Sequence, residues 1–285
     1  MTPNGTQPRP YRGRIAPTPT GELHLGHGRT FHTAWKRCRD AGGTLVFRVE
    51  DLDAQRCKAS WIPGMYADLH WLGISWDEGP DVGGPFGPYV QGERMPWFRE
   101  TWRRLRDTGL IYPSSHSRRD VALALSAPHE GEEEAPFPPA LRPPPGTGRD
   151  APAPDGVNWR FRVPDGRAIA FDDALAGRRT YVAGSDFGDF LVWRKDGFPS
   201  YELAVVADDH AMGITEVVRG EDLLLSTARQ ILLYEALGWT PPAWCHCPLV
   251  RDAQGRRLAK RTPALTLHHL RESGAHPEDL LKPGS

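Results

Sequence analysis

The sequence contains no apolar run near the 18 residues that a membrane-spanning helix requires, so we expect no membrane segment. The first ten residues are polar and lack the apolar stretch of a secretory signal. These two absences lead us to expect a cytoplasmic protein. A basic surplus is also absent, because 35 Lys and Arg stand against 36 Asp and Glu. The net charge of -1 therefore gives no direct support for a nucleic-acid partner.

Cysteine is scarce as well, with four residues in the chain, of which only Cys245 and Cys247 lie close together. A structural zinc site usually takes four ligands from two well-spaced pairs, and no second pair follows these two. We therefore expect buried or incidental roles for the cysteines. The sequence assigns no function to the Cys245 and Cys247 pair.

Alternating strand and helix patterns favour an α/β fold. Residues 12–16 have the pattern of a strand, residues 24–41 that of a helix, and residues 44–49 that of a second, β-branched strand. Such a unit predicts a parallel sheet with a nucleotide site at the carboxyl ends of its strands. Further helices are expected at 60–72, 97–109, 201–208 and 223–237, and further strands at 157–163, 168–171, 190–193, 214–219 and 248–250.

One stretch, residues 126–155, differs in composition from the rest of the chain. It carries an acidic cluster at 130–134, followed by several prolines between 136 and 145. Because it has too few apolar residues to form a core, we expect a mobile loop or insertion.

The most informative segment runs from Arg14 to His27 and reads RIAPTPTGELHLGH. His24 and His27 are three residues apart, so in a first helical turn they project to similar sides. Free N–H groups and the helix dipole favour an anion there, and two imidazoles can contact an ATP phosphate. Gly26 lets the nucleotide approach the backbone closely. The alternative is a helix start with two exposed histidines. The PTPTG segment before the histidines favours the functional interpretation over this alternative.

A second element is the basic loop GRRLAKR at residues 255–261. Such a loop can close over a triphosphate and place the Lys260 ammonium against the leaving pyrophosphate. Taken alone, a basic loop is more often a solvated turn. Its place late in the chain, after a helix and a strand, favours the functional interpretation.

These segments together resemble the glutamyl branch of the class I aminoacyl-tRNA synthetases. HLGH at 24–27 is similar to their HIGH signature, and RLAKR at 257–261 resembles their KMSKS loop. The segments RVEDLD at 48–53, YELAVVADD at 201–209 and VRGED at 218–222 support this branch. The matches run in order from about residue 12 to residue 262.

The resemblance implies a Rossmann-like class I synthetase catalytic domain with an inserted subdomain that resembles an acceptor-binding domain. Its first half is expected at 10–112, the insertion at 113–185, and the second half, with the KMSKS-like loop and a short helical tail, at 186–285. Only 24 residues follow Arg261, so we expect no anticodon-binding domain. Glutamyl-queuosine tRNA(Asp) synthetases share this short form.

The resemblance also assigns residues to the two substrates. His24, His27 and Lys260 are implied as catalytic residues. ATP binding is implied for these three and for Gly26, Arg257, Leu258, Ala259 and Arg261. Glutamate binding is implied for Arg14, Ile15, Ala16, Pro17, Thr18, Glu50, Tyr201 and Arg219. In the alternative interpretation Glu50 belongs to an ion cluster at a strand end with Arg48, Asp51 and Asp53, and Tyr201 is a core tyrosine.

Two positions depart from the family pattern. Ala259 stands where KMSKS has serine, which removes one hydroxyl and weakens catalysis by roughly 0.5–1.5 kcal/mol rather than abolishing it. Many relatives of this type bind zinc through three cysteines and a tyrosine. The matching positions here are Ser114, His116, Phe137 and Leu141, so we expect no zinc.

The implied activity is ATP- and Mg²⁺-dependent formation of glutamyl-adenylate, followed by transfer of glutamate to the queuosine base at the wobble position of tRNA(Asp). The expected partners are L-glutamate, ATP and that tRNA, and the enzyme is expected to be a monomer. One alternative is a glutamyl-adenylate-forming enzyme that uses a carrier protein or a small amine as acceptor. Another is a non-catalytic binding module derived from a synthetase.

Overall fold

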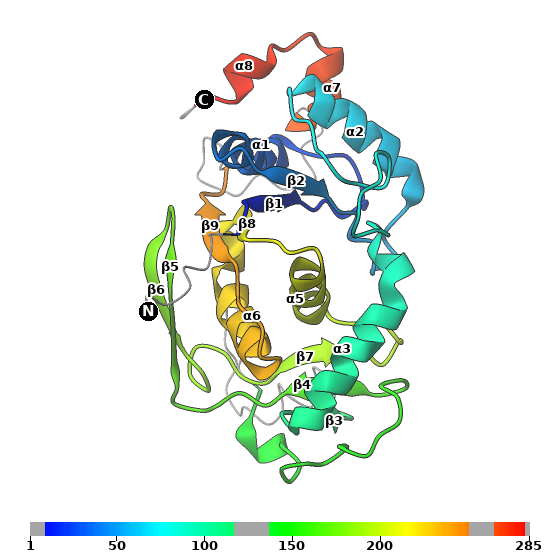
Figure 1. The fold of residues 1–285 in the computed structure, drawn as a ribbon, viewed down its shortest axis with the longest axis vertical. Helices are drawn as coiled ribbons and strands as arrows, with labels where there is room; N and C mark the ends of the chain where they lie inside the picture. The colour runs from blue at the N-terminus through cyan, green and yellow to red at the C-terminus, as the bar shows by residue number, and fades with distance from the viewer. Residues whose placement is uncertain (1–8, 117–136, 251–264, 283–285) are drawn as a thin grey trace, which may run out of the picture.

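The computed structural model describes residues 9–116, 137–250 and 265–282 and has an elongated shape (Figure 1). Strands β1 (Arg12–Ile15), β2 (Thr44–Phe47), β8 (Glu216–Gly220) and β9 (Ala243–Cys247) lie together across its middle. A three-stranded sheet of β3 (Ile111–Ser114), β4 (Asn158–Phe161) and β7 (Phe190–Trp193) lies at the lower end. No helix within the three described ranges is long and apolar enough to span a bilayer.

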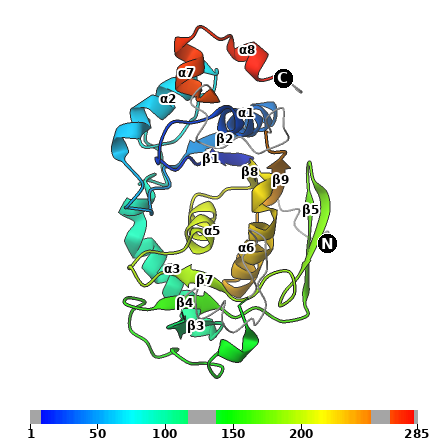
Figure 2. The ribbon, with the colours of Figure 1, turned by 180° about the vertical axis from the view of Figure 1, so that it is seen from behind.

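Helices flank the central strands and connect them to the lower sheet. The turned view in Figure 2 shows α3 (Met95–Thr108) along one side, between α2 (Ile62–Trp71) and the lower sheet. α1 (Leu25–Asp40) lies on the side of the strands opposite to α5 (Tyr201–Ala211) and α6 (Leu224–Ala236). Two short helices, α7 (Leu267–Glu272) and α8 (Pro277–Leu280), lie beside α2 and α1.

The predicted strand–helix–strand unit is confirmed. β1 and β2 are parallel, with Arg14 paired to Val46, and α1 connects them. α1 ends where expected, at the glycine pair 42–43, and Gly42 adopts a φ of 60°. The close approach of Gly43 to Tyr11 explains the second glycine, because an added Cβ would lie 2.5 Å from the Tyr11 carbonyl oxygen.

The hydrophobic core has two parts, and large buried side chains pack in each of them. In the lower part Trp102 of α3 packs edge-on against Trp159 of β4, with ring centroids 4.8 Å apart. The upper part packs Ile15 and Phe47 from the sheet against Leu69 of α2. Cys245 and Cys247 point into this upper core and are buried as predicted. The burial of these side chains is the main term that stabilises each of the two parts.

The structure differs from the sequence-based expectation at two strands. β6 (Gly177–Val182) was not expected, because its first four residues are exposed and give no alternating pattern. It pairs with β5 (Ala168–Asp173) as a hairpin beside β9. The prediction of a strand at 248–250 is wrong. The strand in this region is β9, and Pro248, which follows it, has no N–H with which to continue the ladder.

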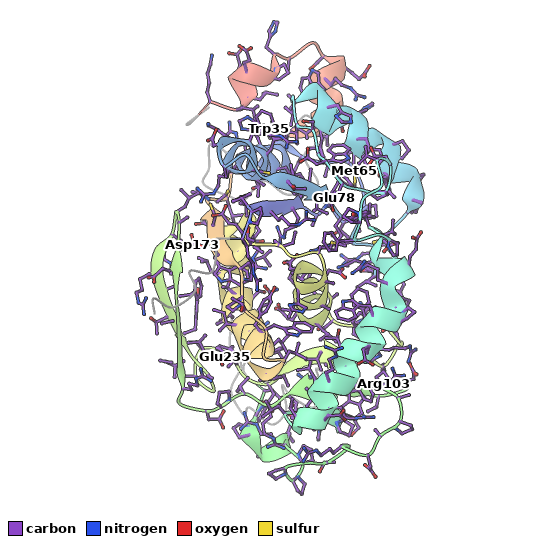
Figure 3. All side chains as sticks on the ribbon, in the orientation of Figure 1. Trp35, Met65, Glu78, Arg103, Asp173 and Glu235 are labelled. Atoms are coloured by element: carbon purple, nitrogen blue, oxygen red, sulfur yellow. The ribbon has the colours of Figure 1, made fainter. Side chains whose placement is uncertain are left out.

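The strands within residues 113–185 belong to two different sheets. β5 pairs with β9 at Asp173 and Trp244, so it belongs to the sheet of β8 and β9. β7, which lies beyond residue 185, pairs with β4. In Figure 3 Asp173 lies where the β5–β6 hairpin meets β9.

Part of the stretch expected to be mobile is packed in the structure. Phe137 is buried at 3% exposure, and the Arg142 guanidinium binds Asp189 at 2.6 and 2.8 Å. Asp155 forms an ion pair with Arg99 of α3. These contacts, which link distant parts of the chain, anchor a proline-rich segment that cannot form a core of its own. Residues 117–136 lie outside the described residues.

Candidate active site

A pocket opens where the order of the central strands reverses. β1 continues through α1 to β2, and β8 continues through α6 to β9, in two parallel units that run in opposite directions across the sheet. The Thr215 N–H donates to the Arg12 carbonyl at 2.9 Å, which joins the β8 side to β1. In open α/β sheets such a reversal is where ligands bind, at the carboxyl ends of the strands.

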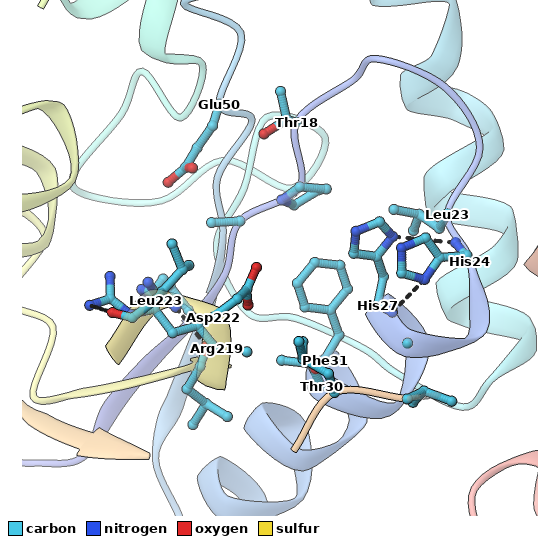
Figure 4. Close-up of a pocket in the computed structure, with 18 of the residues that line it drawn as sticks. Thr18, Leu23, His24, His27, Thr30, Phe31, Glu50, Arg219, Asp222 and Leu223 are labelled. Carbon is cyan, nitrogen blue, oxygen red and sulfur yellow. Dashed lines mark hydrogen bonds between the residues drawn. The ribbon is translucent and has the colours of Figure 1, made fainter. Parts of the chain in front are cut away.

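The residues that line this pocket come from these strand ends, from the first turns of α1 and from the start of α5. Figure 4 shows His24 and His27 on one side, with Glu50 and Arg219 on the other. The lining includes Arg14, Ala16, Pro17, Thr18, His24, Gly26, His27, Thr30, Phe31, Glu50, Tyr201, Arg219, Asp222 and Val250. The site residues predicted within the described parts of the chain are thus brought together, with one exception.

The exception is Ile15. Its side chain is fully buried in the upper core, while its carbonyl accepts the Arg48 N–H at 3.0 Å. Strand alternation places Arg14 and Ala16 in the pocket and the residue between them in the core. The KMSKS-like residues Arg257, Leu258, Ala259, Lys260 and Arg261 lie outside the described residues.

The two histidines form a reciprocal cap at the start of α1. His24 Nδ1 accepts the His27 N–H and His27 Nδ1 accepts the His24 N–H, both at 3.3 Å. Their rings stack with centroids 3.7 Å apart. Because both Nδ1 atoms accept hydrogen bonds, each neutral ring carries its proton on Nε2 and can donate from there. Two imidazole donors thus lie at a helix N-terminus, where an anion is favoured.

Arg219 lies opposite, at the end of β8, and is 5% exposed. Its guanidinium donates to His246 Nε2 at 3.1 Å, to Gln230 Oε1 at 3.0 Å and to Thr227 Oγ1 at 2.8 Å. Weaker contacts reach the Tyr201 hydroxyl at 3.4 Å and a backbone carbonyl. All of these partners within the described chain are electrically neutral. A buried cation without a directly paired carboxylate favours an anionic ligand.

Arg14 and Glu50 supply the other charges of the pocket. Arg14 donates to the Val218 carbonyl at 3.0 Å, and its Nε lies 3.5 Å from Asp209. Glu50 accepts from Arg48 at 3.0 Å. Burial raises the pKa of Glu50, an effect that the nearby guanidinium groups of Arg48 and Arg14 oppose. An incoming ammonium group would further stabilise the ionised carboxylate.

Tyr201 is not the core tyrosine of the alternative interpretation. It begins α5, is 40% exposed and lines the pocket. Its helix is capped by Ser200, whose hydroxyl accepts the Leu203 N–H at 3.3 Å. This cap fixes the point at which the Tyr201 side chain enters the pocket.

A buried ion network lies next to the pocket residues Arg14 and Glu50, and no motif assigned a role to its acidic pair at 208–209. Arg48 is completely buried and donates to Asp209 at 2.7 Å. Asp208 accepts from Arg94 at 2.6 Å and from Gln91 at 2.9 Å. The signal in the sequence was a pair of acidic residues inside an apolar helix, which requires buried partners.

Asp208→Ala is expected to lower the free energy of unfolding by about 3–5 kcal/mol, because it leaves Arg94 buried without its carboxylate. The matched control is Asp155→Ala, which breaks an exposed pair with Arg99 and should cost at most about 1 kcal/mol. Urea denaturation of both variants measures the difference. Equal losses would show that the buried network does not stabilise the fold.

The four positions that match the zinc ligands of relatives lie only partly together in the structure. Ser114 Oγ lies 3.5 Å from His116 Nδ1, and the Phe137 ring stands edge-on to the His116 ring at 6.1 Å. Leu141 ends a short 3₁₀ turn. Across the ranges described, no three His, Cys, Asp or Glu side chains form a group that could hold a metal ion.

Comparison with known proteins gives a consistent set of relatives. A family model described as "tRNA synthetases class I (E and Q), catalytic domain" matches residues 11–283. The "Glutamyl-Q tRNA(Asp) synthetase" of Symbiobacterium thermophilum is 47% identical over 94% of this chain and 84% of that protein. Its counterpart from Nitratidesulfovibrio vulgaris is 45% identical over 92% and 82%.

Solved structures agree on the fold. The glutamate-tRNA synthetase of Elizabethkingia anophelis superposes with a TM-score of 0.77 at 28% identity, over 95% of this chain and 60% of that one. The glutamate tRNA ligase of Elizabethkingia meningosepticum, in complex with its amino acid, gives 0.73 at 29% identity, over 88% and 52%. This chain thus spans about half the length of these solved relatives.

Proposed function

The chain belongs to the class I tRNA synthetase family that serves glutamate and glutamine, and we propose that it activates glutamate with ATP and transfers it to the queuosine base at the wobble position of tRNA(Asp). The family assignment made from the motifs is confirmed, as is the α/β class I synthetase fold. The identities of 45–47% to proteins named for the queuosine reaction favour that acceptor.

The division of the pocket into two sides supports this activity most strongly. One side holds the helix N-terminus with His24 and His27, which suits phosphate. The other side holds Arg14 and Arg219 together with Glu50. Two cations and one anion complement the two carboxylates and the ammonium group of glutamate. We assign Ala16, Pro17, Thr18 and the backbone at Ile15 to the wall of this amino-acid side.

In the first step an oxygen of the α-carboxylate of glutamate attacks the α-phosphorus of ATP. A bond from this oxygen to phosphorus forms while the bond to the leaving pyrophosphate oxygen breaks, which gives glutamyl-adenylate. His24 and His27 donate to the phosphate oxygens, and Gly26 permits the close approach of the nucleotide. Lys260 and its neighbours at 257–261 are assigned to the pyrophosphate from their sequence alone.

Magnesium enters this scheme as part of the substrate. ATP is used as its magnesium complex, and Mg²⁺ is commonly held through substrate phosphates and waters with few protein carboxylates. Asp222 lines the pocket and offers a carboxylate in addition to that of Glu50. In the second step a hydroxyl of the acceptor attacks the activated carbonyl and AMP leaves.

Transfer of labelled glutamate to two forms of tRNA(Asp) tests the proposal. Transfer to tRNA that carries queuosine, but not to the unmodified transcript, is the expected result. Charging of the unmodified transcript would contradict it. Adenylate formation without transfer to either tRNA would instead favour a carrier protein or a small amine as acceptor. Absence of both activities would favour a binding module.

A further inference from the structure

Two buried carboxylates lie near Arg219, and each is separated from it by one neutral side chain. On one side Asp173 Oδ2 contacts His246 Nδ1 at 2.5 Å, while His246 Nε2 accepts from Arg219 at 3.1 Å. Asp173 and His246 are 6% and 1% exposed. Asp173 therefore orients the His246 ring, and the ring in turn orients Arg219. The charge of Asp173 does not come into direct contact with the guanidinium.

The second side repeats the arrangement with an amide. Gln230 donates through Nε2 to Glu202 at 2.8 Å and accepts through Oε1 from Arg219 at 3.0 Å. Gln230 is completely buried and Glu202 is 7% exposed. Since a guanidinium has no acceptor, the amide oxygen must face Arg219 and the NH₂ must face the carboxylate.

His246 must be neutral for its contact with Arg219 to exist. Burial, followed by the charge of Arg219, lowers the pKa of His246, and Asp173 acts against this shift. Asp173 from β5 and Arg219 from β8 are the charged groups that contact the ring, and α6 presents the uncharged Thr227 hydroxyl at 3.1 Å. With Nδ1–H directed to Asp173, Nε2 is an acceptor.

We propose that the pairs Asp173–His246 and Glu202–Gln230 are positioning elements that hold Arg219 through neutral atoms, so that its charge remains available to select a carboxylate over an amide in the substrate side chain. This inference rests on the proposed function, in which Arg219 binds glutamate. Direct contact with Asp173 or Glu202 would fix the guanidinium equally well. It would also neutralise the cation and weaken discrimination against glutamine.

Gln230→Glu and Gln230→Met separate this role from simple structural support. The glutamate variant keeps the shape and the oxygen that accepts from Arg219, but places a negative charge against it. Its carboxyl also lies next to Glu202, so the two carboxyls share one proton. Because Arg219 contacts residue 230, the negative charge lies there and Glu202 keeps the proton. The methionine variant loses the hydrogen bond and adds no charge.

We expect Gln230→Glu to raise the KM for glutamate roughly 10- to 100-fold, and Gln230→Met to raise it less. The KM for ATP should stay within about threefold for both, because the phosphate side of the pocket is unchanged. The ratio of kcat/KM for glutamate over glutamine should fall most in Gln230→Glu. A purely structural role predicts the opposite order, with the variant that keeps the hydrogen bond less affected.

His246→Gln and His246→Asn test the other arm and serve if the Gln230 variants fail to fold. Glutamine reaches far enough to place a neutral acceptor near Arg219, whereas asparagine can contact Asp173 but falls short of the guanidinium. The KM for glutamate should therefore be closer to that of the parent protein in His246→Gln. Equal values in the two variants, with equal melting temperatures, would overturn the positioning role.

The same assays distinguish failure of this inference from failure of the proposed function. The parent protein is measured first for glutamate-dependent ATP–pyrophosphate exchange. No exchange in the parent protein would refute the activity on which the inference rests. Exchange in the parent protein, with Gln230→Glu milder than Gln230→Met, would overturn the inference alone.

Discussion

His24→Asn is expected to slow glutamate-dependent ATP–pyrophosphate exchange roughly 100- to 1000-fold, the usual loss when one donor to a transition-state anion is removed. Asparagine is a good helix cap, so it can still accept the His27 N–H that His24 Nδ1 accepts at 3.3 Å. The Nε2 donor is lost. The rate should therefore fall while the melting temperature is maintained.

His24→Ala and His32→Ala are the controls for this prediction. The alanine at position 24 removes both the donor and the cap, so it should slow exchange and also lower stability by about 1 kcal/mol. His32 lies on the same helix but stacks on Trp35, away from the active-site pocket. Its replacement should leave exchange nearly unchanged. Exchange by His24→Asn at the parental rate would exclude a phosphate contact.

Arg219→Lys is expected to raise the KM for glutamate roughly 100-fold or more, with a much smaller effect on the KM for ATP. Lysine keeps the positive charge but lacks the planar fork. It can hardly donate to His246, Gln230 and Thr227 and at the same time to a substrate carboxylate. The loss should therefore appear in glutamate binding, as measured by exchange at varied glutamate concentrations.

Arg178→Lys on the β5–β6 hairpin is the matched control, because its partner Asp172 is exposed as well. It should leave both KM values unchanged. Circular dichroism melting of Arg219→Lys checks that the fold survives the loss of buried hydrogen bonds. A folded Arg219→Lys enzyme with an unchanged KM for glutamate would show that Arg219 does not bind the substrate.

Local sequence patterns predicted much of the fold because the responsible interactions are local. The cap at His24, the glycine after α1 and the periodicity of α6 all act within a few residues. β9 was missed because a strand of alanine, tryptophan, cysteine and histidine lacks the usual β-branched pattern. Its position is set by pairing with β8, which is distant in sequence.

The site shows the same division between local and distant interactions. Motifs identified His24, His27 and Arg219, whose residue types are tied to their chemistry. No motif in the sequence identified His246 or Gln230, because their roles depend on contacts with Arg219 across three elements of the fold. His246 lies between the two cysteines for which the sequence predicts buried or incidental roles, and in the structure it accepts a hydrogen bond from Arg219.

Glutamate-dependent ATP–pyrophosphate exchange in the absence of tRNA is the most direct test of the proposed activity. The pocket predicts exchange with glutamate, which offers a carboxylate to Arg219, and little exchange with glutamine or aspartate. His24→Asn should abolish most of this exchange. Equal exchange with glutamine, or no exchange with any of the three amino acids, would contradict the assignment of this pocket to glutamate activation.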